Sequence, residues 1–227
     1  MSEAFSPLAG FAGAARLFPL PNLVFFPHVM QPLHIFEPRY RQMTADALAG
    51  DRLIALVLPK PGWEKDYGGC PPLYTVATLG EIVADQKLDD GRYNILLRGL
   101  NRIHLLQEIP HCKLYRKAKA ELLVEAPPSE PAQERKLRKC LIQTAPALFA
   151  KKGDVLDQFR KLLKRDLPLG ALCDLIAFAL ALDVEFKQSL LEELDVATRT
   201  QRLLDHLATM TNAPAGDLHF PPEFSAN

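Results

Sequence analysis

Residues 17–43 form a strongly apolar stretch that prolines interrupt at short intervals. These prolines are Pro19, Pro21, Pro27, Pro32 and Pro38. A proline removes a backbone N–H donor, fixes φ at about −65° and pushes the preceding residue toward an extended conformation. The interruptions exclude one long buried helix and predict short strands joined by sharp corners. Glu37 and Pro38 are typical of the point where a helix begins.

Residues 15–124 show the pattern of β structure, with short apolar runs separated by turn residues. We predict strand-forming segments at 53–58, 73–83, 83–97, 102–108 and 114–124. The segment 83–97 is predicted to be a hairpin, because Asp89-Asp90-Gly91 supplies the positive φ that a tight turn needs. Gly80 is predicted to mark a β-bulge, and Arg98–Asn101 a second break.

The hydrophobic period changes after the segment 126–129, which is predicted to be a linker. Apolar residues then recur at three- and four-residue spacing, as on one face of a helix. Helices are predicted at 130–149, 155–163, 169–182, 184–194 and from 196 onward, with Ser129, Asp183 and Asp195 as caps. Strands followed by helices predict the α+β class. The predicted organisation is a flexible N-terminus at 1–14, a β subdomain at 15–125, a helical subdomain at 129–211 and a C-terminal tail at 212–227.

Composition and charge exclude several classes of protein. The 227 residues include 27 basic and 27 acidic side chains, so a global electrostatic attraction to nucleic acid or to an anionic membrane is absent. No apolar run is long enough for a transmembrane helix, and the N-terminus lacks the basic start of a signal peptide. Four widely spaced cysteines without a C-x-x-C pair predict reduced thiols and a cytoplasmic location.

Motifs of catalysis are missing from the sequence. Phosphate-binding glycine loops and the G-x-S-x-G nucleophile motif do not occur, and none of the five serines is placed as a nucleophile. His28, His34 and Glu37 have the residue types of a zinc site, but the predicted corner separates the two histidines. The alternative is that His34 lies in the β core and bonds a main-chain group. No catalytic residue, metal site or cofactor is predicted.

Two other features could contact a partner. Basic clusters occur at Lys113, Arg116, Lys117 and Lys119, at Arg135, Lys136, Arg138 and Lys139, and at Arg160, Lys161, Lys164 and Arg165. Such clusters can contact phosphates but are more often a solvated face. Trp63 and Tyr67 lie in the segment 59–72, whose prolines and glycines predict a loop. These aromatic side chains either contact a partner or are buried as the loop folds back.

A longer signature resembles the start of the N-terminal domain of Lon-type ATP-dependent proteases. It consists of LFPL at 17–20, VFFP at 24–27 and PLHIFEPRYR at 32–41, followed by Met43. YNILLRG at 93–99 resembles a later strand and turn of that domain. DLIA at 174–177, KQSLLE at 187–192 and LDV at 194–196 resemble its helical end, so the resemblance covers about residues 15–210.

This resemblance implies a PUA-like six-stranded β barrel followed by a C-terminal helical bundle. In Lon proteases this domain helps to recognise unfolded or damaged substrates. The 227 residues contain no counterpart of the ATPase and Ser-Lys protease domains, so the chain is expected to be a stand-alone Lon-domain protein. His28 departs from the family, which often has glycine there, and this is expected to alter a turn.

The expected function is therefore a non-catalytic module that binds unfolded or extended polypeptide segments, with a protease or a chaperone as a possible partner. Phe25, Phe26, Trp63 and Tyr67 are the predicted contact residues, in a groove or beside a free strand edge. The alternative is an RNA-binding module of PUA-like type, which the basic clusters favour and the zero net charge disfavours. A hydrolase is the third hypothesis for the function. Neither nucleic acid nor a membrane is the expected partner.

Overall fold

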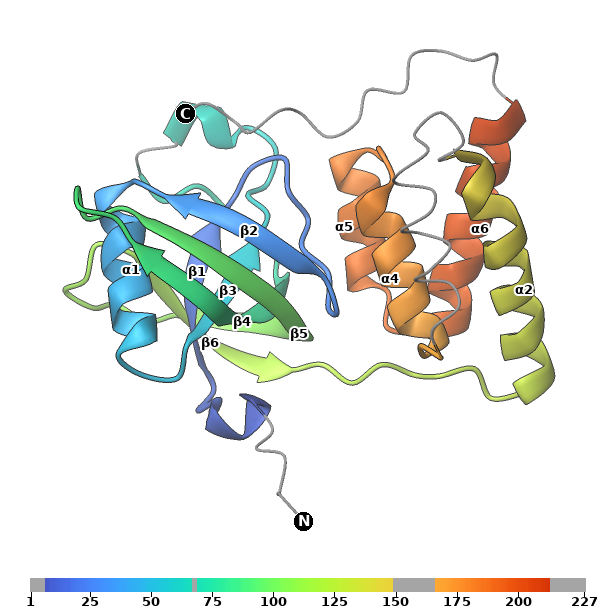
Figure 1. Ribbon diagram of the computed structural model, residues 1–227, viewed down its shortest axis with the longest axis horizontal. Coiled ribbons are helices and arrows are strands. Elements are labelled where there is room, and N and C mark those ends of the chain that lie inside the picture. The colour runs from blue at the N-terminus through green and yellow to red at the C-terminus, as the bar shows by residue number, and fades with distance from the viewer. Residues whose placement is uncertain (1–6, 67–68, 149–165, 213–227) are drawn as a thin grey trace. The chain divides into compact units, whose positions relative to one another are not determined.

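The structure, a computed structural model, describes residues 7–66, 69–148 and 166–212 (Figure 1). The chain forms two compact units, residues 1–124 and residues 125–227, called the barrel unit and the helical unit below. The boundary between them lies beside the proline-rich segment that the sequence predicts as a linker. None of the described helices has the length and apolar character that a membrane span requires.

The described part of the barrel unit consists of strands with one α-helix and two short 3-10 helices. In chain order the elements are η1 (Pro7–Gly10), β1 (Ala14–Pro19), β2 (Met30–Ile35), α1 (Pro38–Leu48), β3 (Leu53–Val57), η2 (Trp63–Asp66), β4 (Val76–Lys87), β5 (Tyr93–Glu108) and β6 (Arg116–Leu122).

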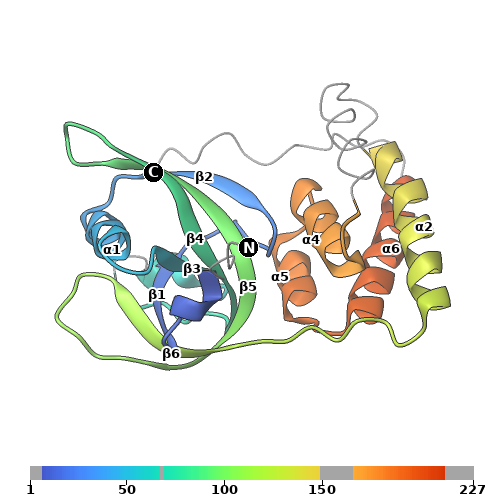
Figure 2. The same cartoon turned by 60° about the horizontal axis from the view of Figure 1, so that its bottom comes forward.

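The six strands form one sheet in the order β2-β5-β4-β3-β1-β6, and β5 also pairs with β6. This extra pairing closes five of the strands into a ring, and β2 joins the ring beside β5, as Figure 2 shows. The pairing of β1 with β3 is parallel, and the other pairings between these strands are antiparallel. The predicted α+β class and the six strands are confirmed, and the sheet is ring-like because five of the six strands close on one another.

β5 is continuous from Tyr93 to Glu108, so the predicted break at Arg98–Asn101 is wrong. At this point the ladder shifts register, because Leu79 pairs with Asn101 whereas Gly80 pairs with Gly99. The shift confirms the bulge predicted at Gly80. A bulge bends and twists a strand, which helps the first half of β5 to pair with β2 and the second half with β6.

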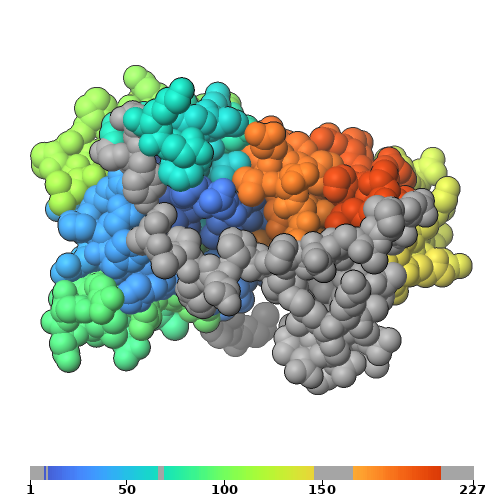
Figure 3. Space-filling model, turned by 90° about the horizontal axis from the view of Figure 1, so that it is seen from above, coloured from blue at the N-terminus to red at the C-terminus, as the bar shows by residue number. Residues whose placement is uncertain are grey.

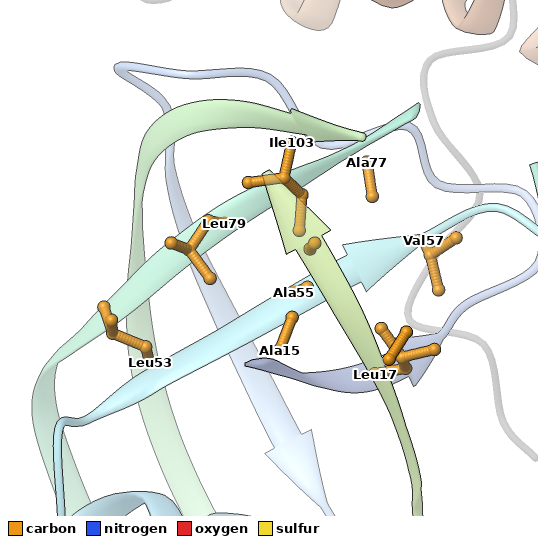
Figure 4. Close-up of a cluster of buried hydrophobic side chains, with 10 residues drawn as sticks. Ala15, Leu17, Leu53, Ala55, Val57, Ala77, Leu79 and Ile103 are labelled. Atoms are coloured by element: carbon orange, nitrogen blue, oxygen red, sulfur yellow. The ribbon is translucent and has the colours of Figure 1, made fainter. Parts of the chain in front are cut away.

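Small and branched apolar side chains fill the interior of the ring (Figure 4). The cluster consists of Ala15, Leu17, Leu53, Ala55, Val57, Ala77, Leu79, Ile103, Ala118 and Ala120. Five of these ten residues are alanines, because a ring of so few strands leaves little room inside. Leu8 and Phe11, which lie in the segment predicted to be flexible, pack against the same cluster.

The apolar segment 24–27 packs against two glycines that are distant in sequence. A Cβ atom at Gly80 would lie 3.1 Å from the Phe25 ring, and a Cβ atom at Gly99 would overlap the carbonyl oxygen of Phe26. The Thr78 hydroxyl donates a hydrogen bond of 2.5 Å to the Phe25 carbonyl. The two phenylalanine side chains are 2% and 0% exposed, so both belong to the buried core of the barrel unit.

His28 forms the corner that follows Pro27. Its φ of 65° lies in the left-handed region that glycine adopts freely and that costs another residue about 1 kcal/mol. The His28 N–H donates to the Gly99 carbonyl at 2.9 Å, and the Gly99 N–H donates to the Val29 carbonyl at 2.8 Å. The corner therefore has the backbone conformation of a glycine turn although histidine occupies it.

Two predicted element ends are confirmed in the barrel unit. Gly91 has a φ of 80° in the turn between β4 and β5, as the hairpin prediction requires. Glu37 is the N-cap residue of α1 and Pro38 is the first residue of the helix. α1 packs against β1, β2 and β3 and buries Tyr40, Met43, Thr44 and Ala47.

The helical unit contains four described helices. They are α2 (Pro131–Leu148), α4 (Leu169–Ala179), α5 (Val184–Glu192) and α6 (Val196–Asn212), and α6 packs against the other three. The helix predicted at 155–163 lies outside the described residues. Asp195 caps α6 as predicted, since its carboxylate accepts from the Thr198 N–H at 2.6 Å, and this bond lowers the pKa of Asp195. Asp183 is the N-cap residue of α5, but its side chain makes no capping hydrogen bond.

A buried arginine connects the segments of the helical unit. The Arg199 side chain is fully buried; its guanidinium lies 2.7 Å from the Glu125 carboxylate and 3.2 Å from the Asp174 carboxylate, and donates to the Glu193 carbonyl at 2.6 Å. Burial alone would lower the pKa of Arg199, but the charges of Asp174 and Glu125 outweigh it and raise the pKa. Gly170 leaves the space for this cluster, since a Cβ atom there would lie 2.8 Å from Glu125.

Lys187 in α5 is a source of instability at neutral pH. Its ammonium donates to the Phe178 carbonyl at 3.0 Å, and burial lowers the pKa of the ammonium from 10.5 to about 8. The unfolded chain holds this proton up to about pH 10.5, whereas the folded chain releases it near pH 8. The free energy of unfolding therefore rises between these two pH values, by about 3 kcal/mol, and below pH 8 the full penalty remains.

We expect Lys187→Met to raise the free energy of unfolding by about 2 kcal/mol at pH 7, since the lost hydrogen bond offsets part of the gain. The difference in the free energy of unfolding between Lys187→Met and the wild type should disappear as the pH approaches 10.5. Urea denaturation of both proteins at a series of pH values measures this difference, and the comparison cancels the other groups that titrate in the window. Equal stability at pH 7 would contradict the prediction.

Candidate functional site

The barrel unit contains a pocket with a volume of about 420 Å³. Three segments line it: the end of β1 with the start of α1, the segment that joins β3 to β4, and the turn between β5 and β6 (residues 109–115). Figure 3 shows the second and third of these segments next to each other on the surface of the barrel unit. We call this feature the loop pocket.

Arg116 joins two walls of the loop pocket. Its guanidinium donates to the Pro71 carbonyl at 2.8 Å and to both carboxylate oxygens of Glu108, where the Nε–Oε2 distance is 2.9 Å. The Ile109 N–H donates to the Lys117 carbonyl at 2.8 Å and begins the β5–β6 turn. Bidentate pairing is geometrically specific, so the loop before β4 is fixed to the end of β5.

Contacts with α1 hold the other side of the β5–β6 turn. The Tyr115 hydroxyl donates to the Asp46 carboxylate at 2.9 Å, the Lys113 ammonium lies 3.2 Å from it, and the Leu114 N–H donates to the Gln42 side chain at 2.8 Å. Burial alone would raise the pKa of Asp46, but the bonds from Tyr115 and Lys113 and the charges of Lys113 and Arg16 hold it below its usual value. Burial and the bond to Asp46 raise the pKa of Tyr115. The Tyr115 hydroxyl thus stays protonated to donate to an ionised Asp46 at neutral pH.

The walls of the loop pocket are mainly apolar and poor in backbone donors. Four prolines line it, namely Pro19, Pro59, Pro71 and Pro110. Ile109, Leu114, Tyr40 and Tyr115 add apolar and aromatic surface. The Tyr40 ring is fixed between Phe18, at 4.3 Å between ring centroids, and the Arg39 guanidinium, at 4.6 Å. Such surface fits apolar side chains.

Residues 14–209 match the family described as the ATP-dependent protease La (LON) substrate-binding domain. The chain belongs to this family. Lon protease 2 of Myxococcus xanthus is 29% identical over 201 residues, which are 84% of this chain and 23% of that protein. Lon protease of Dictyoglomus thermophilum is 29% identical over 195 residues, which are 84% of this chain and 24% of that protein. The chain therefore spans about a quarter of the length of the curated relatives it matches.

Two solved structures have the fold of this LON substrate-binding domain. The N-terminal domain of the Mycobacterium avium complex Lon protease aligns with a TM-score of 0.65 and 16% identity, over 86% of this chain and 98% of that one. The Lon N-terminal domain protein from Xanthomonas campestris aligns with a TM-score of 0.60 and 20% identity, over 85% of this chain and 97% of that one. The fold of a Lon N-terminal domain, which the resemblance implied, is confirmed.

The LON domain places the predicted contact residues in different environments. Trp63 lies in η2 and is half-buried, and Tyr67 lies outside the described residues. Phe25 and Phe26 are buried, so a partner would reach them only after a local rearrangement, and their role as contacts stays a prediction. The segment 59–72 does contribute to the loop pocket, through Pro59 and residues 69–71.

The sequence prediction missed the β5–β6 turn as part of the site. Its most exposed large hydrophobic side chain in the pocket is Leu114, at 64%. The only signal in the sequence was the basic cluster that begins at Lys113. In the structure Arg116 is paired with Glu108 and Lys113 with Asp46. The cluster at Arg160–Arg165 lies outside the described residues.

The predicted alternative for His34, a place in the β core with a main-chain bond, is wrong. His34 is exposed, and its Nδ1 lies 2.7 Å from the Asn94 side-chain oxygen. Glu37 pairs with Arg39 at 2.9 Å. No group of three metal-ligating side chains occurs within residues 7–66, 69–148 and 166–212. The four cysteines are free thiols, with Cys70 and Cys112 exposed.

The edge strand β2 is a poor template for an added strand, which was one of the predicted docking routes. Among the described strands β2 pairs with β5 alone. In an antiparallel ladder, the backbone N–H and C=O groups of every second residue point toward the partner strand. The Gly99 N–H donates to the Val29 carbonyl, so Val29 is one of the residues that point toward β5. Pro32 lies three positions further on, so its backbone nitrogen and carbonyl point away from β5. Pro32 has no N–H to donate, and the Gln31 side chain already donates to its carbonyl at 2.8 Å.

Proposed function

We propose that this LON domain binds unfolded or extended stretches of other polypeptides in the loop pocket and catalyses no reaction. The observation behind this proposal is a pocket walled by proline and tyrosine rings in a chain whose family is described as a substrate-binding domain. The pocket volume lies in the range of about 300–1,000 Å³ that ligand sites have, which is enough for a few side chains. Such a module acts with a protease or a chaperone in the cytoplasm.

The chemistry of the walls supports an apolar peptide ligand. Proline and tyrosine rings give rigid apolar surface, and a side chain buried against them contributes about 1–3 kcal/mol. The walls are fixed by the bonds of Arg116 and Tyr115, so little ordering is needed on binding.

RNA binding is the weaker candidate. Two of the four cations at Lys113–Lys119 are held by carboxylates within the same unit, and the chain has no net charge. Phosphate binding needs cations that are free to replace counterions.

We expect Leu114→Ser to weaken the binding of an unfolded protein by about fivefold to tenfold, because it removes an apolar contact worth about 1 kcal/mol. The probe is fluorescein-labelled lactalbumin, reduced and carboxymethylated so that it stays unfolded, and the readout is fluorescence anisotropy. Leu114 is largely exposed, so the variant should keep its melting temperature.

Leu106→Ser is the matched control, because Leu106 is 56% exposed on β5 and does not line the pocket. Its affinity should equal that of the wild type. Equal loss in both variants would place binding elsewhere, and no binding of the wild type at high micromolar concentration would refute the proposed function. An RNA complex of similar affinity that weakens with salt would favour the alternative.

A further inference from the structure

We propose that the loop pocket selects peptide segments in which acidic side chains flank an apolar or aromatic one. This inference rests on the proposed function and adds the chemical class of the ligand. It comes from the charges on the pocket walls.

The side chains that line the loop pocket have an excess of positive charge. Four cations, Arg39, Lys113, Arg116 and Lys117, line it together with one carboxylate, Glu108. Three of the cations have carboxylate partners within the barrel unit: Glu37 for Arg39, Asp46 for Lys113 and Glu108 for Arg116. Two of these partners, Glu37 and Asp46, do not line the pocket, so their negative charge lies outside the space that a ligand would occupy.

Lys117 differs from the other three cations. It is half-buried on β6, and its ammonium has no ion-pair partner among the residues that the structure describes. A carboxylate of a bound peptide would supply that partner. A charged pair at the partly desolvated edge of a pocket interacts more strongly than a fully exposed pair, because less water screens it.

The two parts of the ligand therefore have separate contacts. The apolar side chain lies among the proline and tyrosine rings, and the adjacent acidic side chain reaches Lys117. A basic side chain of the peptide at the position beside Lys117 meets uncompensated positive charge. The pocket therefore disfavours basic side chains there as well as favouring acidic ones. Binding of an acidic segment should weaken with salt, as expected for contacts within a Debye length of about 10 Å.

Three fluorescein-labelled peptides of equal length test the inference by anisotropy. Each has a central phenylalanine in a glycine-serine frame, flanked on both sides by aspartate, asparagine or lysine. We expect the aspartate peptide to bind about threefold to tenfold more tightly than the asparagine peptide, and the lysine peptide to bind most weakly. High salt should bring the three affinities together.

Lys117→Glu should reverse the order of the aspartate and lysine peptides and leave the asparagine peptide nearly unchanged. Lys87→Glu is the matched control, because it makes the same change in net charge at an exposed site outside the pocket. Its order of affinities should be that of the wild type.

The outcomes separate this inference from the proposed function. If all three peptides bind equally and Leu114→Ser weakens them all, the charge preference is wrong and the peptide-binding function stands. If Lys87→Glu and Lys117→Glu change the order equally, the preference comes from net charge and not from the pocket, and the inference is wrong. If no peptide and no unfolded protein binds, both are wrong.

Discussion

Arg199→Met is expected to lower the free energy of unfolding of the helical unit by about 3–5 kcal/mol. The substitution removes the cation but leaves the Asp174 carboxylate, which is 1% exposed, inside the bundle. It also removes the bonds to Glu125 and to the Glu193 carbonyl, which connect the first residue of the unit to the junction of α5 and α6. Thermal and urea denaturation followed by far-ultraviolet circular dichroism measures the change, because most of the described helix lies in this unit.

Arg202→Met is the control on the same helix. Arg202 is partly exposed and donates to the Ser189 hydroxyl at 2.9 Å, so its loss should cost at most about 1 kcal/mol. The double variant Arg199→Met with Asp174→Leu should recover much of the stability, because no buried charge is then left without its partner. Similar melting temperatures for Arg199→Met and Arg202→Met would show that the buried cluster contributes little.

Gly99→Ala is expected to destabilise the barrel unit by about 3 kcal/mol. The added Cβ atom would overlap the Phe26 carbonyl oxygen and lie 3.1 Å from the Pro27 Cα atom. These are backbone atoms and cannot turn away as a flexible side chain can. The shift would also strain the bonds that join Gly99 to His28 and Val29.

Trp63 is the only tryptophan of the chain and lies in the barrel unit, so its fluorescence during urea denaturation reports this unit. Gly10→Ala is the control, because a Cβ atom there meets nothing within 4 Å, and its effect should stay within about 0.5 kcal/mol. If Gly99→Ala were as stable as the wild type, the segment 24–27 would be able to move aside without loss of stability, and the prediction would be wrong.

Local chemistry made part of this fold predictable from the sequence. The turn at Gly91 and the start of α1 at Pro38 depend on residues whose backbone preferences are strong, and both were predicted correctly. The cap at Asp195 likewise depends on a side chain next to the helix it caps. The family signature could be recognised because its apolar residues and its prolines are close together in the chain.

Features that depend on distant parts of the chain were not predictable in this way. Arg98–Asn101 has the residues of a turn, yet β5 continues because β2, β4 and β6 all pair with this strand. The burial of Phe25 and Phe26 could not be predicted locally, because it depends on Gly80 and Gly99, which are distant in the sequence. The loop pocket is assembled from residues that lie up to about a hundred positions apart, so no local pattern indicated Leu114 or Lys117 as neighbours of Pro19.

Pro32 has a consequence for the behaviour of this protein in a crowded solution. Unfolded chains are rich in segments that form β aggregates on any available edge, and a module that meets them repeatedly is at risk of seeding such growth. The middle of β2 offers neither a free donor nor a free acceptor, so a captured chain has no continuous ladder to extend. If the domain binds such segments as proposed, side-chain contacts hold them, and the interrupted edge of β2 does not become the first layer of a fibril.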